Sequence, residues 1–111
     1  MRVYNGAHSV PQMGVIKNIT TSPATTTLIS RNEGFTRINS ISVANFSDNA
    51  DGATVNIYFK TGATDLYLIK NCVIPKGVSL ILDNGYYFPN NLYGLVMYST
   101  GTAPALTVII D

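Results

Sequence analysis

The sequence predicts an all-β protein, an antiparallel β-sandwich of jelly-roll-like form with an extended N-terminal arm. Short runs rich in β-branched and aromatic residues follow one another at intervals of roughly 8–12 residues, the spacing typical of sandwiches and barrels. Turn signals containing Gly, Pro, Asn or Asp separate these runs. No stretch repeats apolar residues at the i, i+3, i+4 and i+7 positions of a helix over two turns with matching caps.

The length of 111 residues predicts a single domain, which we expect to cover residues 15–111 after an arm over residues 1–14. Gly6, Pro11 and Gly14 interrupt any regular period in the arm. Two interpretations of the arm stay open: a frayed terminus, or an extension that lies across a neighbouring subunit. In the second case its apolar residues are interface residues, namely Val3, Tyr4, Val10 and Met13.

The first two strands are expected at residues 15–20 and 25–30, separated by the break at Ser22-Pro23. The second run, TTTLIS, is rich in β-branched residues, and a turn over residues 31–34 follows it.

Residues 35–46 predict one long third strand. Ile41 and Val43 share a face of this strand, whereas Ile38 and Phe46 have the opposite parity. We therefore expect a bulge or a bend within it.

A hairpin is expected after the polar loop 47–52, which ends in an Asp-Gly turn signal. The first hairpin strand, residues 53–60, alternates, and the turn 61–64 returns the chain into a second strand over residues 65–70, which runs on towards Val73 and Ile74. Tyr58 and Tyr67 should therefore lie close together across the hairpin. We expect Val55, Ile57 and Phe59 to face inward, and Asn56, Tyr58 and Lys60 to face outward.

The last strands are expected at residues 78–83, 93–99 and 105–111, which gives eight in all. The turn Pro75-Lys76-Gly77 redirects the chain into the first of these, because Pro fixes one backbone angle and Gly frees another. Residues 86–91 are aromatic and are then interrupted by Pro89.

Side chains for catalysis or metal binding are scarce, so we expect no enzyme, no catalytic residue, no cofactor and no metal site. His8, the single histidine, lies in the arm, and Cys72, the single cysteine, lies in an apolar run that favours a small buried hydrophobe. A His/Cys zinc site would need more ligands than these two. Calcium binding by Asp48, Asn49 and Asp51 is a weak alternative, because the loop lacks the spacing and the bidentate glutamate of known calcium loops.

The charge content is low, with 12% charged residues and a formal net charge of +1. The basic residues are scattered, so we expect no nucleic-acid partner, and no run is long enough to span a bilayer. The N-terminus lacks the apolar core of a signal peptide, which favours a protein made in the cytoplasm. The surface is expected either to be covered by copies of the chain or a larger partner, or to be solvated by Ser, Thr and Asn.

Aromatic residues gather in one segment near the C-terminus: Tyr86, Tyr87, Phe88 and Tyr93. Core and sheet packing is the first interpretation of these residues, and a protein interface is the second. The third is carbohydrate binding through Tyr58, Tyr67 or the Tyr86–Tyr87 pair.

Four segments spread over about two thirds of the chain carry a resemblance to a known group of proteins. They are RINSISVAN at Arg37–Asn45, VNIYF at Val55–Phe59, YLIKNCVIPKGVSLIL at Tyr67–Leu82 and TVII at Thr107–Ile110. These segments resemble strands of small virion structural proteins of tailed bacteriophages. Cys72 departs from the apolar or small residue expected there, and the arm has no counterpart.

The resemblance implies a non-enzymatic β-sandwich that is made in the bacterial cytoplasm and becomes part of the virion. The favoured role is a decoration or cement protein on the capsid, with the major capsid protein or other virion proteins as partners. A homo-oligomer, for example a trimer, is expected. The alternatives are a neck, tail or fibre component of the virion, and a carbohydrate-binding module.

Overall fold

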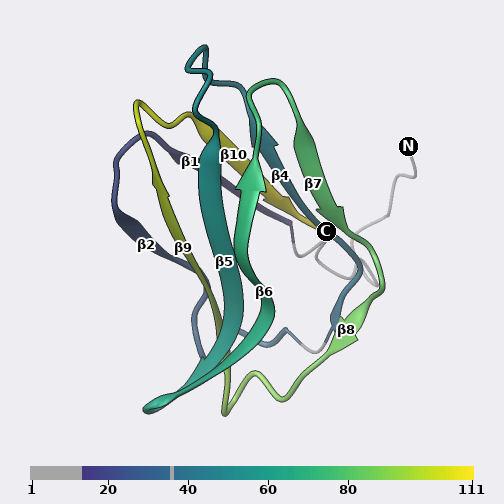
Figure 1. The fold of residues 1–111 in the computed structure, drawn as a ribbon. Helices are drawn as coiled ribbons and strands as arrows, with labels where there is room; N and C mark the ends of the chain where they lie inside the picture. Colours follow the sequence, from purple (N-terminus) through teal and green to yellow (C-terminus); the bar gives the residue numbers. More distant parts are fainter. Residues whose placement is uncertain (1–13, 36) are drawn as a thin grey trace, which may run out of the picture.

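The computed structural model describes residues 14–35 and 37–111, which contain ten strands and no helix (Figure 1). The all-β prediction is confirmed. The strands are β1 (Val15–Ile19), β2 (Ala24–Ile29), β3 (Arg37–Ile38), β4 (Ile41–Asn45), β5 (Ala53–Thr61), β6 (Thr64–Ile74), β7 (Ser79–Leu82), β8 (Tyr86–Tyr87), β9 (Gly94–Gly101) and β10 (Leu106–Ile110).

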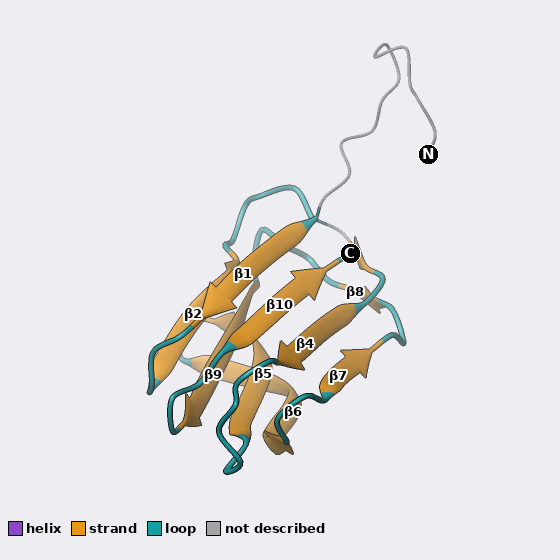
Figure 2. Ribbon diagram, turned by 90° about the horizontal axis from the view of Figure 1, so that it is seen from above, coloured by secondary structure: helices purple, strands orange, loops and turns teal. Residues whose placement is uncertain are grey.

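Eight of the strands form two antiparallel sheets of four strands each. Sheet A has the order β1-β10-β4-β7, and sheet B has the order β2-β9-β5-β6. The two short strands β3 and β8 pair with each other at one end. Figure 2 shows the two sheets as separate layers, and one hydrophobic cluster lies between them. The prediction of an antiparallel β-sandwich is therefore confirmed.

The strand pairing follows one long hairpin whose tip is the turn between β5 and β6. From the tip outward, β5 pairs with β6 and β4 with β7, and then β2 pairs with β9 and β1 with β10. Two further pairs, β10 with β4 and β5 with β9, complete the two sheets. Most successive strands therefore lie in opposite sheets.

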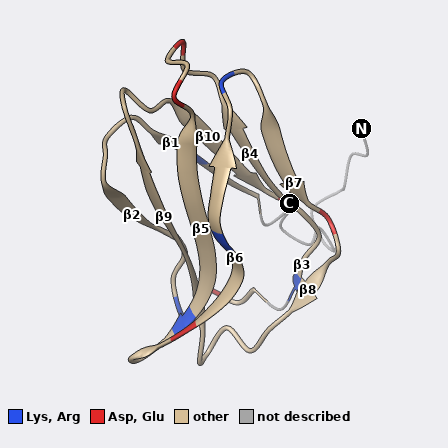
Figure 3. Ribbon diagram, viewed as in Figure 1, with Lys and Arg blue, Asp and Glu red and all other residues tan. Residues whose placement is uncertain are grey.

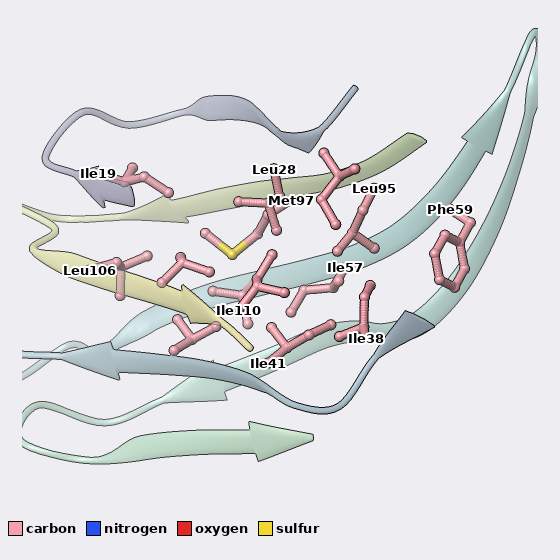
Figure 4. Packing of buried hydrophobic residues seen from close by; sticks show 14 of the residues in the cluster. Ile19, Leu28, Ile38, Ile41, Ile57, Phe59, Leu95, Met97, Leu106 and Ile110 are labelled. Carbon is pink, nitrogen blue, oxygen red and sulfur yellow. The ribbon is translucent and has the colours of Figure 1, made fainter. Parts of the chain in front are cut away.

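The core is built by alternate residues of the strands, because successive side chains point to opposite faces of a sheet (Figure 4). The expected inward residues of β5 are buried, as are those of β4 and β10. On the other face of β5, Lys60 is exposed, but Asn56 and Tyr58 are only 7% and 8% exposed. Both face outward, but Tyr58 packs against the Tyr67 ring, and the Asn56 side chain is hydrogen-bonded to the backbone of Tyr98 and Asn71. These outward positions are therefore not exposed.

The prediction of one long strand over residues 35–46 is wrong, because the chain is broken after Ile38. The backbone N–H groups of Asn39 and Ser40 donate to the carbonyl oxygen of Asp111 at 2.7 and 3.2 Å, and the N–H of Asp111 donates to Ser40 O. β3 therefore pairs with β8 while β4 joins sheet A. Ile38 is fully buried although its parity is opposite to that of Ile41 and Val43, because it belongs to β3 and not to β4.

The turn at Pro75–Gly77 is fastened by the buried Asn45. The Asn45 side-chain amide donates to the carbonyl oxygen of Ile74 at 2.8 Å, and the N–H of Gly77 donates to the carbonyl oxygen of Asn45 at 2.7 Å. Gly77 has a φ of +74°, which an L side chain rarely adopts. This segment therefore serves the connection between the two sheets.

Candidate functional site

An apolar hollow lies at the end of the sandwich that carries β8, and we call it the aromatic hollow. It has a volume of about 200 Å³. An apolar cavity of roughly 150 Å³ can hold benzene, so the aromatic hollow has room for one apolar side chain of a partner. Its lining contains no charged residue and consists of Phe59, Leu66, Tyr87, Phe88, Pro89 and Tyr93.

Phe59 of β5 organises the aromatic packing in and around the hollow. Its ring centroid lies 4.8 Å from that of Phe88 and 6.5 Å from those of Tyr86 and Tyr93. The two tyrosine rings stand edge-on to Phe59, at interplanar angles of 70° and 73°. Edge-to-face aromatic pairs add about 0.5–1.5 kcal/mol each beyond burial, so these contacts stabilise this wall of the hollow.

The rim of the hollow is open to solvent at Tyr87 and Leu66. Their side chains are 77% and 46% exposed. The guanidinium carbon of Arg37 lies 5.2 Å from the centre of the Tyr87 ring, and the two residues are paired in the β3–β8 ladder. This cation–π contact holds the exposed ring in place at the rim.

The loop that carries the hollow's residues 88–93 is fixed by Asn90. Its side-chain oxygen accepts hydrogen bonds from the N–H groups of Glu33 (2.7 Å) and Phe35 (3.3 Å). Its side-chain amide donates to the carbonyl oxygens of Ser30 (3.0 Å) and Tyr93 (2.9 Å). Asn90 is 5% exposed, and it ties the β2–β3 connection to the β8–β9 connection.

The structure brings three of the predicted interface residues into the hollow: Tyr87, Phe88 and Tyr93. Tyr86 lies behind it, half-buried against Phe59, because the alternation of β8 points Tyr86 inward and Tyr87 outward. The four predicted interface residues of the arm lie outside the described residues, namely Val3, Tyr4, Val10 and Met13.

Sequence reasoning missed three lining residues: Phe59, Leu66 and Pro89. Phe59 was expected only in the core, where it does pack at 9% exposure. The hairpin register pairs Phe59 with Leu66, and this pairing could have been inferred from the short turn between β5 and β6. The approach of Phe88 to Phe59 could not have been inferred, because the two residues lie in segments that are far apart in the sequence.

Tyr58 and Tyr67 lie on the outer face of sheet B, with ring centroids 5.1 Å apart. Their predicted proximity across the hairpin is confirmed. Burial, and secondarily the charge of Asp65, raises the pKa of Tyr58 above its ordinary value. The Tyr67 ring is half-exposed with the Lys70 ammonium 4.9 Å from its centre. Tyr58 is thus too covered to stack on a sugar ring.

Two side-chain oxygens of the polar loop between β4 and β5 accept hydrogen bonds from the loop's own backbone. Ser47 Oγ accepts the N–H of Asn49 at 3.0 Å, and Asn49 Oδ1 accepts the N–H of Asp51 at 2.9 Å. Within residues 14–35 and 37–111, no group of three or more His, Cys, Asp or Glu side chains is placed to hold a metal ion. Cys72 is half-buried against the core.

The outer face of sheet A differs from that of sheet B in its charge. Figure 3 shows few charged positions along the strands. Lys17 is the one charged residue in the four strands of sheet A, and the register pairs it with Val108, which is buried on the inner side. Sheet B carries the Lys60–Asp65 ion pair at 3.1 Å on its outer side. The outer face of sheet A is thus uncharged.

No protein-family model matches the chain, and no curated protein is significantly similar to it. Among the described residues, no helix has the length and apolar character to cross a membrane.

Proposed function

We propose that the chain is a non-enzymatic structural protein of a virion that docks on the capsid as a decoration or cement protein. The virion setting rests on the resemblance of four strand segments to small structural proteins of tailed bacteriophages. The major capsid protein is the proposed main partner, and the proposed form is a homo-oligomer such as a trimer. The aromatic hollow is the proposed docking site.

The observation that carries this proposal is the chemistry of the aromatic hollow. Its lining is apolar and free of charge, and an exposed tyrosine stands at its rim. Aromatic anchors in well-packed apolar pockets dominate the energetics of protein interfaces. The hollow therefore favours an apolar side chain of a protein partner over a charged substrate or a nucleic acid.

We further infer that the sandwich is wound as a jelly roll. A jelly roll arranges eight strands in two sheets through two Greek keys. A long hairpin rolled so that β4 meets β10 and β5 meets β9 fits that winding, and these pairings occur here.

The first experiment locates the chain in purified virions of the phage that encodes it. Quantitative mass spectrometry should find hundreds of copies per particle, and electron microscopy should place them on the capsid lattice. A dozen or fewer copies on the tail axis would instead favour the neck, tail or fibre alternative. Absence of the chain from the purified particles would refute a virion role.

The second experiment tests the docking site. Tyr87→Ala should weaken attachment to capsids lacking the protein by roughly tenfold, the effect of losing about 1.4 kcal/mol of binding energy. Leu92→Ala is the control, because Leu92 is 49% exposed on the connection that follows β8 but does not line the hollow. Equal attachment of the Tyr87→Ala variant and the wild-type protein would remove the hollow from the interface.

The carbohydrate-binding alternative is less favoured by the geometry. Tyr86 and Tyr87 point to opposite sides of β8, so they do not form one flat exposed platform. Tyr58 is buried beside Tyr67, so this pair does not form one either. Binding of the wild-type protein on a glycan array, together with loss of that binding in the Tyr67→Ala variant, would restore this alternative.

A further inference from the structure

A cation without a carboxylate partner stands beside the uncharged aromatic hollow. Arg37 is exposed, and its guanidinium carbon lies 5.2 Å from the centre of the Tyr87 ring at the rim. The one ion pair among the described residues joins Lys60 to Asp65. All six Asp and Glu residues of the chain lie in the described part, so Arg37 is not neutralised by a carboxylate side chain of its own chain.

The local backbone places the guanidinium at the rim. Arg37 and Tyr87 are direct partners in the β3–β8 ladder, so their side chains leave the same face of this pair of strands. A Cβ added at Gly85 would lie 3.6 Å from Nη2 of Arg37, so the guanidinium also lies beside the turn that precedes β8. A guanidinium carries five N–H donors, and stacking on an aromatic ring uses none of them. Arg37 is therefore a positioned cation with hydrogen-bonding capacity left.

The hollow and Arg37 together specify two chemical groups on one partner. The hollow, with a volume of about 200 Å³, takes an apolar side chain. Arg37 can bind a carboxylate through two parallel N–H···O hydrogen bonds, which are among the strong hydrogen bonds of proteins. A nucleic acid is bound through many phosphate contacts, and the lining of the hollow supplies no further cation. The pair of features therefore fits an acidic segment of a protein.

The distance between the two features limits the spacing of these groups on the partner. A side chain packed against the far face of the Tyr87 ring would lie about 4 Å from the ring and thus about 9 Å from the guanidinium carbon. An extended chain advances about 3.3 Å per residue, so about three residues span this distance. We propose that the docking segment of the partner fills the hollow with a large apolar residue and pairs an Asp or Glu, within three residues of it, with Arg37. This inference rests on the docking role proposed above for the hollow.

Photocrosslinking identifies the segment. Leu66→p-benzoylphenylalanine places a photoreactive side chain at the rim of the hollow and leaves Arg37 and Tyr87 intact. The full-length variant is bound to purified capsids that lack the protein and is irradiated, and the crosslinked peptides are sequenced by mass spectrometry. We expect a capsid-protein segment with a large apolar residue and an Asp or Glu within three residues of it. A segment without such a carboxylate would overturn the proposal.

Removal of the charge tests the ion pair. Arg37→Gln should weaken attachment to the same capsids roughly fivefold, and added NaCl should weaken attachment of the variant less than that of the wild-type protein. Lys76→Gln is the control, because it removes the same charge at an exposed position in the turn between β6 and β7 and should attach like the wild-type protein. Equal attachment of Arg37→Gln and the wild-type protein, or an equal loss in Lys76→Gln, would refute the pairing.

A double-mutant cycle separates the ion pair from support of the Tyr87 ring. Replacing the identified Asp or Glu of the capsid protein with Asn or Gln should weaken attachment of the wild-type protein but should not weaken that of Arg37→Gln further. Two independent losses that multiply would show that Arg37 acts only by holding the ring, and the proposal would fail.

The outcomes also separate this inference from the docking role on which it rests. If Tyr87→Ala weakens attachment and Arg37→Gln does not, the hollow docks on the capsid without a carboxylate, and only this inference fails. If neither variant weakens attachment, or if the wild-type protein does not attach to the capsids, both proposals fail.

Discussion

The side chain of Asn90 should contribute more to stability than any other polar side chain in the loops around the aromatic hollow. Asn90→Ala removes four hydrogen bonds at once, two that its oxygen accepts and two that its amide donates. The bond from the Asn32 N–H to the Asn90 carbonyl oxygen is retained, because the substitution keeps the backbone.

The magnitude follows from the surroundings of the four partners. A net contribution of about 1 kcal/mol for each hydrogen bond gives about 4 kcal/mol as an upper value. The N–H of Glu33 and the carbonyl of Ser30 belong to exposed residues and can bind water after the substitution, whereas Phe35 is buried and Tyr93 is half-buried. We therefore expect a loss of about 2–3 kcal/mol in the free energy of unfolding.

Thermal unfolding followed by circular dichroism provides the assay. With an unfolding entropy of about 2.1 cal/mol/K per residue, a loss of 2–3 kcal/mol lowers the Tm of a chain of this length by about 10 °C. The control is Asn91→Ala, since Asn91 is exposed and Arg31 contacts only its backbone oxygen. A Tm for Asn90→Ala within about 2 °C of wild type, or an equal fall for Asn91→Ala, would refute the reasoning.

Three further predictions follow from single contacts. Gly94→Ala should lower the free energy of unfolding by about 1–3 kcal/mol in urea denaturation, because an added Cβ would lie 2.8 Å from the carbonyl oxygen of Ile29; an unchanged midpoint would contradict this. Ser99→Ala should raise the free energy of unfolding by about 1 kcal/mol, because the buried Ser99 hydroxyl has no hydrogen-bond partner among the described residues. A lower free energy of unfolding would contradict this and show that the hydroxyl is hydrogen-bonded. Burial, then Asp65, raises the pKa of Tyr58, so the folded state keeps a proton that the unfolded state loses above pH 10.0, and stability should fall as the pH rises beyond that value. Tyr58→Phe should abolish this component of the alkaline stability loss, and an unchanged pH profile would disprove its origin.

The strands could be predicted from the sequence because alternation is a local signal. Val55, Ile57 and Phe59 recur at every second position, and the short turn after them sets the register that joins Tyr58 to Tyr67. The break in residues 35–46 was signalled by the parity of Ile38, but its cause was not.

The order of strands across the sheets could not be predicted in the same way, because it depends on pairs distant in the sequence. The neighbour of Ser42 on one side is Ile109, and no local pattern specifies that pairing. The aromatic hollow has the same character, since Phe59 meets Phe88 only after both sheets have formed. Asn90 resembled an ordinary turn residue in the sequence, because its four partners belong to two separate connections.

The two outer faces of the sandwich together explain the low charge content. Sheet B is covered on its outer side by threonines and tyrosines, among them Thr25, Thr27 and Tyr98, with the Lys60–Asp65 pair at its end. Water can solvate that face through these polar uncharged groups, so the face needs no partner. Sheet A presents the exposed isoleucines Ile16, Ile81 and Ile109 on its outer side instead. A surface solvated through polar uncharged groups thus suits sheet B, and sheet A is the face to which the other interpretation, a surface covered by a partner, would apply.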